Sequence, residues 1–318
     1  MDKLKALKNA LLVVCYILLG GTLLCELLVF FAPQKYYFDL LSHLVPHYLT
    51  IQVICLIVFF ILRYFKTSCL AALFIVYNVI LLAPLFLPAS TGSMEGGEKL
   101  KLLVFNINLR NDAVEDVVEY VKRMDPDVFC LLETDLSWES IYNNNFKNIY
   151  GFKKSELRTD CFGVLFCSRL PVKDANIIYL SESKVPSTSA KVILKGREIQ
   201  ITVVHPLPPG KQWTFEDRNM FLQNVGELMK ANGGLQILTG DLNTTPWNWS
   251  FRKLLKTSGL KDSGRGLGFQ PTWLAGSTFL KMPIDHCLIS PEIAVIKREI
   301  GPVLGSDHYP QYLELRIP

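Results

Sequence analysis

The charged residues of this 318-residue chain are distributed very unevenly. Residues 1–90 hold only six of the 33 Lys and Arg residues and three of the 29 Asp and Glu residues. Three apolar runs in this part, at residues 10–31, 48–65 and 69–87, each approach the roughly 20 residues that a helix needs to cross a bilayer. The pattern predicts three transmembrane helices, and it excludes both a disordered chain and a single water-soluble globule.

The basic residues around these runs predict their orientation. Lys3, Lys5 and Lys8 precede the first run, and Arg63 and Lys66 lie between the second and the third. The positive-inside rule assigns both clusters to the cytoplasm, so the N-terminus is cytoplasmic and the chain after the third span lies outside. We therefore expect a multi-pass protein of a bacterial inner or plasma membrane with a periplasmic or extracellular C-terminal part. A cleaved signal peptide is the weaker interpretation, because the first run is too long for one.

Glu26 is the only acidic residue inside a predicted span. A carboxylate at such a position usually faces a partner helix or lies near the membrane interface. We favour this interpretation over a proton or ion site.

The remaining chain has the composition of a soluble domain. Its basic and acidic residues are nearly equal in number, which argues against a strongly basic nucleic-acid binder. We divide the chain into a membrane region at residues 1–89, a linker rich in Gly and Ser at 90–98, and a single domain at 99–318. The eight cysteines show no metal-site spacing, and we expect free thiols.

Short strand-like runs alternate with helical runs in residues 99–318, as in layered α/β proteins. The predicted strands are residues 100–107, 128–133, 162–168, 190–194, 198–204, 236–241, 285–290 and 311–317. The predicted helices are residues 113–124, 215–230 and 251–255.

Polar residues recur where these strands meet loops. The set is Asn106, Glu133, His205, Asp241 with Asn243, Asp285 with His286, and Asp307 with His308. Each one alone has a structural explanation, such as an Asn or Asp in a turn or a packed histidine. Their joint occurrence at strand ends indicates an active site, because a layered sheet gathers such ends at one edge.

The motifs that contain these residues resemble those of the endonuclease/exonuclease/phosphatase superfamily. They are Val104-Phe105-Asn106-Ile107, Leu131-Leu132-Glu133, Cys167-Ser168-Arg169-Leu170-Pro171, Val203-Val204-His205-Pro206, Gly240-Asp241-Leu242-Asn243, Ile284-Asp285-His286 and Gly305-Ser306-Asp307-His308-Tyr309-Pro310. The resemblance covers residues 100–318 and implies a DNase I-like, four-layer α/β/β/α sandwich. The apolar runs before it are similar to those of the membrane-anchored bacterial branch.

The resemblance also implies the role of each residue. Glu133, Asn106 and Asp307 would bind a divalent metal, and oxygen ligands favour Mg²⁺ or Mn²⁺. The implied catalytic residues are Asp241, His205 and the Asp285–His308 pair, and either Asp241 or that pair is the base. Asn243 and Arg169 would bind the substrate. The chain departs from the family pattern at Leu132, where Gln is common, and at His286, which we expect to be structural.

These features predict a metal-dependent phosphoesterase on the outer side of a membrane. A tether keeps the catalytic domain close to the bilayer, so lipid or lipid-linked headgroups are the favoured substrates. A tethered nuclease is the alternative, and a non-catalytic receptor or scaffold with the same fold is the second alternative. The expected partners are the bilayer and the phosphate-ester substrate, and nothing in the sequence points to an obligate protein partner.

Overall fold

The computed structural model describes residues 2–88 and 95–318. The chain forms two compact units, one of Met1–Pro88 with Trp247–Trp249 and one of Ala89–Pro246 with Ser250–Pro318. Residues 89–94, which include part of the predicted linker, lie outside the described residues.

The first unit is helical. It contains α1 (Asp2–Phe31), α2 (Tyr36–Ser42), α3 (Val45–Ile61), α4 (Phe65–Leu82) and the short η1 (Ala83–Leu85). Two helical stretches, residues 3–31 and 65–85, are long and apolar enough to cross a membrane. The α2–α3 pair, bent by 62°, makes a third span if both helices are counted as one. The structure therefore contains the predicted three spans when the bent pair is counted as one span. The apolar run at residues 48–65 gave no indication of this bend.

The second unit contains two six-stranded sheets. The first sheet has the order β11-β12-β1-β2-β4-β3. Its strands are β1 (Glu98–Asn106), β2 (Val128–Leu132), β3 (Phe152–Glu156), β4 (Val164–Ser168), β11 (Ala294–Ile300) and β12 (Gln311–Ile317). Within it, β1 and β2 run parallel, with Asn106 paired with Leu132 at their carboxyl ends.

The second sheet has the order β5-β6-β7-β8-β10-β9. Its strands are β5 (Val172–Tyr179), β6 (Pro186–Leu194), β7 (Arg197–Val204), β8 (Gln236–Asp241), β9 (Lys261–Asp262) and β10 (Asp285–Ile289). The β7–β8 pair is parallel, and β10 runs antiparallel to β8 with Asp285 opposite Asp241.

The alternation of apolar side chains along the inner strands explains how the layers form. Leu102 and Val104 of β1 belong to a core that also contains Ile201 and Val203 of β7, so the two sheets pack face to face. On the other face of β1, Leu103 belongs to a second core, which two helices of this unit cover. These helices are α5 (Val114–Met124) and α6 (Ser137–Asn145).

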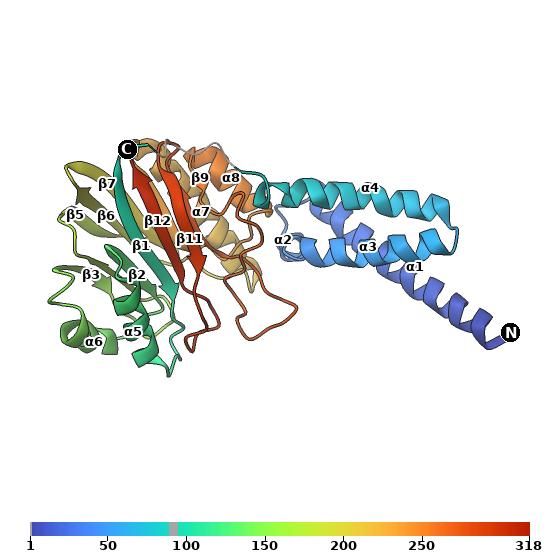
Figure 1. Ribbon diagram of the computed structural model, residues 1–318, viewed down its shortest axis with the longest axis horizontal. Helices are drawn as coiled ribbons and strands as arrows, with labels where there is room; N and C mark the ends of the chain where they lie inside the picture. The colour runs from blue at the N-terminus through green and yellow to red at the C-terminus, as the bar shows by residue number, and fades with distance from the viewer. Residues whose placement is uncertain (1, 89–94) are drawn as a thin grey trace. The chain divides into compact units, whose positions relative to one another are not determined.

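A third core covers the outer face of the second sheet. It joins β8 and β10 to α7 (Gln212–Asn232) and α8 (Trp249–Ser258). Helix, sheet, sheet and helix therefore stack as four layers (Figure 1). This arrangement confirms the predicted α/β sandwich. All eight cysteines are free in the described chain, as expected from the sequence.

Candidate active site

The strand directions bring the predicted site residues to one edge of the sandwich. Asn106 ends β1, Glu133 follows β2, His205 follows β7 and Asp241 ends β8. Because β1–β2 and β7–β8 are parallel pairs, the carboxyl ends within each pair lie side by side. Asp285 joins them from the start of the antiparallel strand β10.

Asn106 links the two sheets at this edge. Its buried side-chain nitrogen Nδ2 donates to Glu133 Oε1 at 3.0 Å and to Asp241 Oδ2 at 3.2 Å. The other Glu133 oxygen, Oε2, accepts a hydrogen bond from the backbone N–H of Leu109 at 3.1 Å. Glu133 adopts a left-handed backbone with φ of 62°, a conformation that residues other than glycine seldom adopt outside constrained sites. The fold therefore fixes the direction of this carboxylate.

Asp241 lies between two imidazole rings. Its Oδ2 is 3.4 Å from His205 Nε2 and 3.6 Å from His308 Nε2. The second oxygen, Oδ1, accepts the backbone N–H of Asn243 at 2.9 Å. The carboxylate is thus held in place by its own loop while it faces both histidines.

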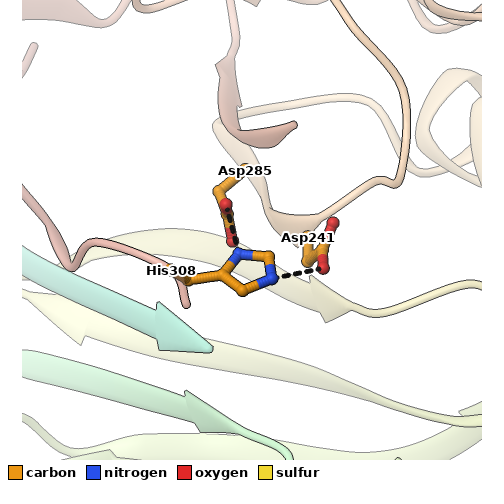
Figure 2. Close-up of side chains that lie close together, drawn as sticks. All are labelled: Asp241, Asp285 and His308. Atoms are coloured by element: carbon orange, nitrogen blue, oxygen red, sulfur yellow. Dashed lines mark hydrogen bonds and ion pairs between the residues drawn. The ribbon is translucent and has the colours of Figure 1, made fainter. Parts of the chain in front are cut away.

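His308 also contacts a second carboxylate. Its Nδ1 is 2.8 Å from Asp285 Oδ2, so the ring lies between Asp285 on one side and Asp241 on the other (Figure 2). The backbone N–H of Asp285 donates to Thr272 Oγ1 at 2.9 Å, which fixes the start of β10. The predicted Asp–His pair is therefore formed in the structure.

The charges of these groups support one another. Burial favours the neutral form of Asp241, but His308 and His205 outweigh that effect and lower its pKa to about 2. Burial alone would lower the pKa of His308, yet Asp285 and Asp241 raise it to about 10. The pKa of His205 is likewise raised, because its interaction with Asp241 outweighs burial. The arrangement therefore favours an ionised Asp241 beside a protonated His308.

Two groups of side chains at this edge have the donor atoms for a metal ion. One is the predicted set around Glu133. In the other, donor atoms of Asp241, Asp285 and His308 all lie within 4.8 Å of one another. Both ring nitrogens of His308 face carboxylate oxygens, and a ring that carries protons on both nitrogens has no lone pair to offer a metal.

The group around Glu133 fits a divalent ion better. Glu133 Oε1 and Asp241 Oδ2 both lie within 3.2 Å of the Asn106 amide nitrogen. The Asn106 oxygen Oδ1 lies beside this group and accepts the Asn108 backbone N–H at 3.1 Å. Carboxylate oxygens with an amide beside them suit Mg²⁺ or Mn²⁺.

Asp307 lies in a network of its own. Its Oδ1 accepts a hydrogen bond from Asn108 Nδ2 at 2.7 Å, and its Oδ2 accepts one from Trp273 Nε1 at 3.0 Å. Asn108 also bonds through its backbone N–H to Asn106 Oδ1 at 3.1 Å, so Asp307 is linked to the Glu133 group through Asn108. Asn108 could not be identified from the sequence, because no motif or spacing distinguishes it from a turn residue.

The loop after β8 is held by a buried arginine. Arg218 of α7 is fully buried, and its Nη1 donates to the backbone carbonyl of Asn243 at 3.0 Å. Asn243 has a left-handed backbone with φ of 49°, and its side-chain Nδ2 donates to the Pro206 carbonyl at 3.0 Å. Arg218 thus supports the loop that carries two predicted site residues. The sequence contained a signal for it, since Arg218 lies three residues after Phe215 and four before Leu222, on the buried face of the helix.

Arg169 is not brought to this cluster, and its prediction as a substrate-binding residue is corrected. It follows β4, which is antiparallel to β2, with Val128 opposite Ser168 and Leu132 opposite Val164. The residue after Ser168 therefore lies at the end of the sheet away from Glu133. Arg169 there contacts Asp125 and donates to the hydroxyl of Tyr150 at 3.1 Å.

His286 has the structural surroundings that the sequence analysis expected. Its Nε2 donates to the Thr244 carbonyl at 2.8 Å, and its ring packs on Phe251 with centroids 4.4 Å apart. Burial lowers its pKa and favours the neutral ring.

Comparison with protein families gives a match to the Endonuclease/Exonuclease/phosphatase family over residues 103–308. This range contains all of the predicted site residues, from Asn106 to His308. A comparison with curated proteins found no match.

Several solved structures share this fold. TDP2 from D. rerio, complexed with single strand DNA product, has a TM-score of 0.60 and 16% identity over 69% of this chain and 100% of its own. A family protein from Bacteroides thetaiotaomicron has a TM-score of 0.58 and 19% identity over 70% of this chain and 100% of its own. Beta toxin from Staphylococcus aureus has a TM-score of 0.51 and 15% identity over 67% and 99%. At these identities the likeness concerns the fold.

Proposed function

Because the chain belongs to the endonuclease/exonuclease/phosphatase family, we propose that it is a membrane-anchored, Mg²⁺-dependent phosphoesterase acting on lipid or lipid-linked headgroups. Members of this family are metal-dependent hydrolases of phosphate esters, and the chain is a hydrolase of this class. The observation that carries the proposal is the convergence of Glu133, Asp241 and the Asp285–His308 pair at one edge of the sandwich.

Glu133 and Asn106 are the side chains that would hold the metal, with Asp307 reaching it directly or through water. When bound, Mg²⁺ supplies positive charge that stabilises the charge developing on the oxygens of the reacting phosphate. The fixed direction of Glu133 suits this role, because a carboxylate already held by the Leu109 backbone N–H needs little reorganisation on binding.

The remaining residues have separate roles in hydrolysis. Asp241 orients the attacking water and accepts its proton, since its carboxylate is anchored through Oδ1 while Oδ2 faces the site. His308, oriented by Asp285, donates to a phosphate oxygen through the nitrogen that now faces Asp241. His205 protonates the leaving oxygen or binds the phosphate. Asn243, positioned by Arg218, binds a further phosphate oxygen.

The apolar helices support a membrane location for this chemistry. In this proposal residues 1–89 are the anchor, residues 90–98 join it to the catalytic domain at 99–318, and that domain faces the outer side. Attachment to the bilayer raises the effective concentration of the active site toward lipid headgroups without any new contact. The near balance of basic and acidic residues outside the first 90 residues agrees with this, because a nonspecific nuclease gains affinity from many Lys and Arg contacts to phosphates.

A nuclease is the second candidate. The structure of TDP2 from D. rerio with a single strand DNA product shares this fold. Trp213 is 58% exposed at the start of α7, shortly after His205, and an exposed indole can stack on a base.

Parallel assays on two substrates test the proposal. The purified full-length protein is offered headgroup-labelled phospholipid vesicles and plasmid DNA, each with Mg²⁺ and with excess chelator. We expect chelator-sensitive release of the phospholipid headgroup, and the variant Asp241→Asn should release none. Cleavage of the DNA without release of the phospholipid headgroup would show that the protein is a nuclease and not a lipid phosphoesterase. Protease treatment of intact spheroplasts tests the orientation, since protection of residues 95–318 would contradict an outward-facing domain.

A further inference from the structure

The helical unit contains a short segment from much later in the chain. Trp247–Trp249 belongs to this unit together with the apolar helices, although the residues on both sides of the segment belong to the second unit. Only three residues, 244–246, separate it from Asn243, and Asp241 lies two residues further back. The contacts of this segment therefore bear on the loop that carries two proposed site residues.

Asn248 is bound by a buried carboxylate of α2. Asp39 is fully buried and Asn248 is 1% exposed. The side-chain nitrogen Nδ2 of Asn248 donates to Asp39 Oδ1 at 2.8 Å and to Ser42 Oγ at 2.7 Å. Ser42 Oγ in turn donates to the backbone carbonyl of Asp39 at 2.6 Å. Because a buried carboxylate gains strongly from each hydrogen-bond donor, this contact holds Asn248 more firmly than an exposed hydrogen bond would.

Trp247 is held by both packing and a hydrogen bond. Its ring is buried in a small apolar core with Val45, Leu82 and Leu85. Its Nε1 donates to the backbone carbonyl of Ser42 at 2.9 Å. Ser42 is the last residue of α2, and carbonyls in the last turn of a helix lack partners within that helix. The break between α2 and α3 thus supplies the acceptor for the indole.

The stretch 244–246, which joins this segment to the catalytic loop, has little freedom. Its first carbonyl accepts a hydrogen bond from His286 Nε2 at 2.8 Å, and it ends in a proline, whose ring fixes one backbone dihedral. A displacement of Trp247 is therefore passed on to Asn243. The backbone N–H of Asn243 donates to Asp241 Oδ1 at 2.9 Å, so the displacement also reaches the carboxylate that orients the water.

We propose that the apolar helices position the catalytic loop as well as anchoring the protein, with Asp39 and Ser42 holding Asn248 and thereby fixing the loop that carries Asp241 and Asn243. Asp39 and Asn248 are positioning residues in this proposal, since they act on turnover through the loop. The effect on rate rests on the proposed hydrolysis, whereas the effect on the loop does not.

Hydrogen exchange of the full-length protein in detergent micelles tests the loop directly. The backbone N–H groups of Leu242 and Asn243 each donate a hydrogen bond at 2.9 Å, so their exchange reports on the order of the loop. We expect Asn248→Ala to speed exchange in residues 242–245 by about tenfold, the effect of losing one buried hydrogen bond. Exchange in α5 should stay unchanged, which shows that the catalytic domain remains folded.

A milder variant keeps the test decisive if Asn248→Ala does not fold. Trp247→Phe keeps an aromatic ring in the apolar core and removes the Nε1 donor to Ser42. It should also speed exchange in residues 242–245, by about threefold or more.

Turnover and its rescue test the consequence for the site. In the phospholipid assay Asn248→Ala should lower kcat by about tenfold or more, because small displacements of catalytic groups cost up to about 10²-fold in rate. Asn248→Asp places two carboxylates against each other and should lower kcat as well. Adding Asp39→Asn to Asn248→Asp restores a donor opposite an acceptor, and it should return kcat to within about threefold of wild type and slow the exchange again.

The matched control is a buried amide elsewhere in the helical unit. Glu26 Oε1 accepts hydrogen bonds from Gln52 Nε2 at 2.8 Å and from Asn78 Nδ2 at 2.6 Å. This cluster joins α1, α3 and α4 and confirms the expectation that Glu26 faces partner helices. Gln52→Ala removes a buried hydrogen bond of the same kind and should leave both kcat and the exchange of residues 242–245 at wild-type values.

The outcomes separate this proposal from the proposed hydrolysis. Unchanged exchange in Asn248→Ala and Trp247→Phe would overturn it, as would equally fast exchange in Gln52→Ala. Faster exchange with a wild-type kcat would overturn the positioning role. A wild-type protein that hydrolyses no phosphate ester would refute the proposed function, while the exchange measurement would still decide whether the helices fix the loop.

Discussion

The substitution Asp285→Asn tests whether Asp285 acts in hydrolysis through His308 and not through the metal. Asp285 is buried, and its carboxylate contacts His308 Nδ1 at 2.8 Å. Asparagine has the same shape and keeps the backbone hydrogen bond to Thr272, so the fold should be retained. It removes the negative charge that keeps the His308 ring protonated and oriented.

The size of the effect follows from this contact. Replacing a charge-assisted hydrogen bond of about 1.5–3 kcal/mol by a neutral one of about 0.5–1.5 kcal/mol costs about 1–1.5 kcal/mol. The loss of a correctly protonated His308 also removes its hydrogen bond to the phosphate oxygen in the transition state, an effect of typically about 10²-fold or more. We therefore expect kcat to fall by about 10²-fold to 10³-fold, with little change in KM.

Steady-state hydrolysis at a series of Mg²⁺ concentrations measures both quantities. Because we place the metal at Glu133, the Mg²⁺ concentration for half-maximal rate should stay unchanged in Asp285→Asn. The matched control is Asp217→Asn, which alters a buried carboxylate that accepts hydrogen bonds from Ser181 and Ser183, away from the site. Its kcat should equal that of the wild type. A kcat within about fivefold of wild type in Asp285→Asn, or a large rise in its Mg²⁺ requirement, would refute the reasoning.

Three further substitutions probe other parts of the account. Glu133→Gln should raise the Mg²⁺ concentration for half-maximal rate by about tenfold or more, measured in the same titration, and an unchanged requirement would contradict the metal assignment. Gly240→Ala should unfold the domain or lower its melting temperature markedly by calorimetry, because Gly240 has φ of +136° and a Cβ there would lie 1.9 Å from the Val204 carbonyl oxygen. Arg218→Lys should lower kcat by about tenfold, because one amine cannot hold the Asn243 carbonyl and the Asn219 side chain in the way that the guanidinium does. A normal kcat in Arg218→Lys with a lowered melting temperature would make Arg218 purely structural.

The sequence predicted the inner strands of both sheets and missed the outer ones. The eight predicted strands correspond to the inner strands, whose side chains are mostly buried on both faces. The four that were missed, β3, β5, β9 and β11, are the four sheet edges. Their residues are largely half-buried or exposed, as in Phe152–Glu156, so they lack the apolar runs that reveal a buried strand.

The candidate site was predictable to the extent that strand direction could be inferred. Asn106, Glu133, His205 and Asp241 meet because each follows or ends a strand of a parallel pair. Arg169 also follows a strand, but that strand is antiparallel, and a motif in the sequence does not show which way its strand runs.

The partners of Asp307 could not be predicted either. Asn108 and Trp273 reach this carboxylate from loops far apart in the chain, at separations of 199 and 34 residues. Such contacts depend on how the loops close over the sheet edge, which hydrophobic periodicity does not determine.

Chelator-sensitive hydrolysis of a phosphate ester by the purified full-length protein, compared with Asp241→Asn, tests the proposed active site most directly. We predict that the wild type hydrolyses headgroup-labelled phospholipid with Mg²⁺, and that both chelator and the substitution abolish the reaction while the domain stays folded. Hydrolysis that persists at the wild-type rate in Asp241→Asn would contradict the proposed active site.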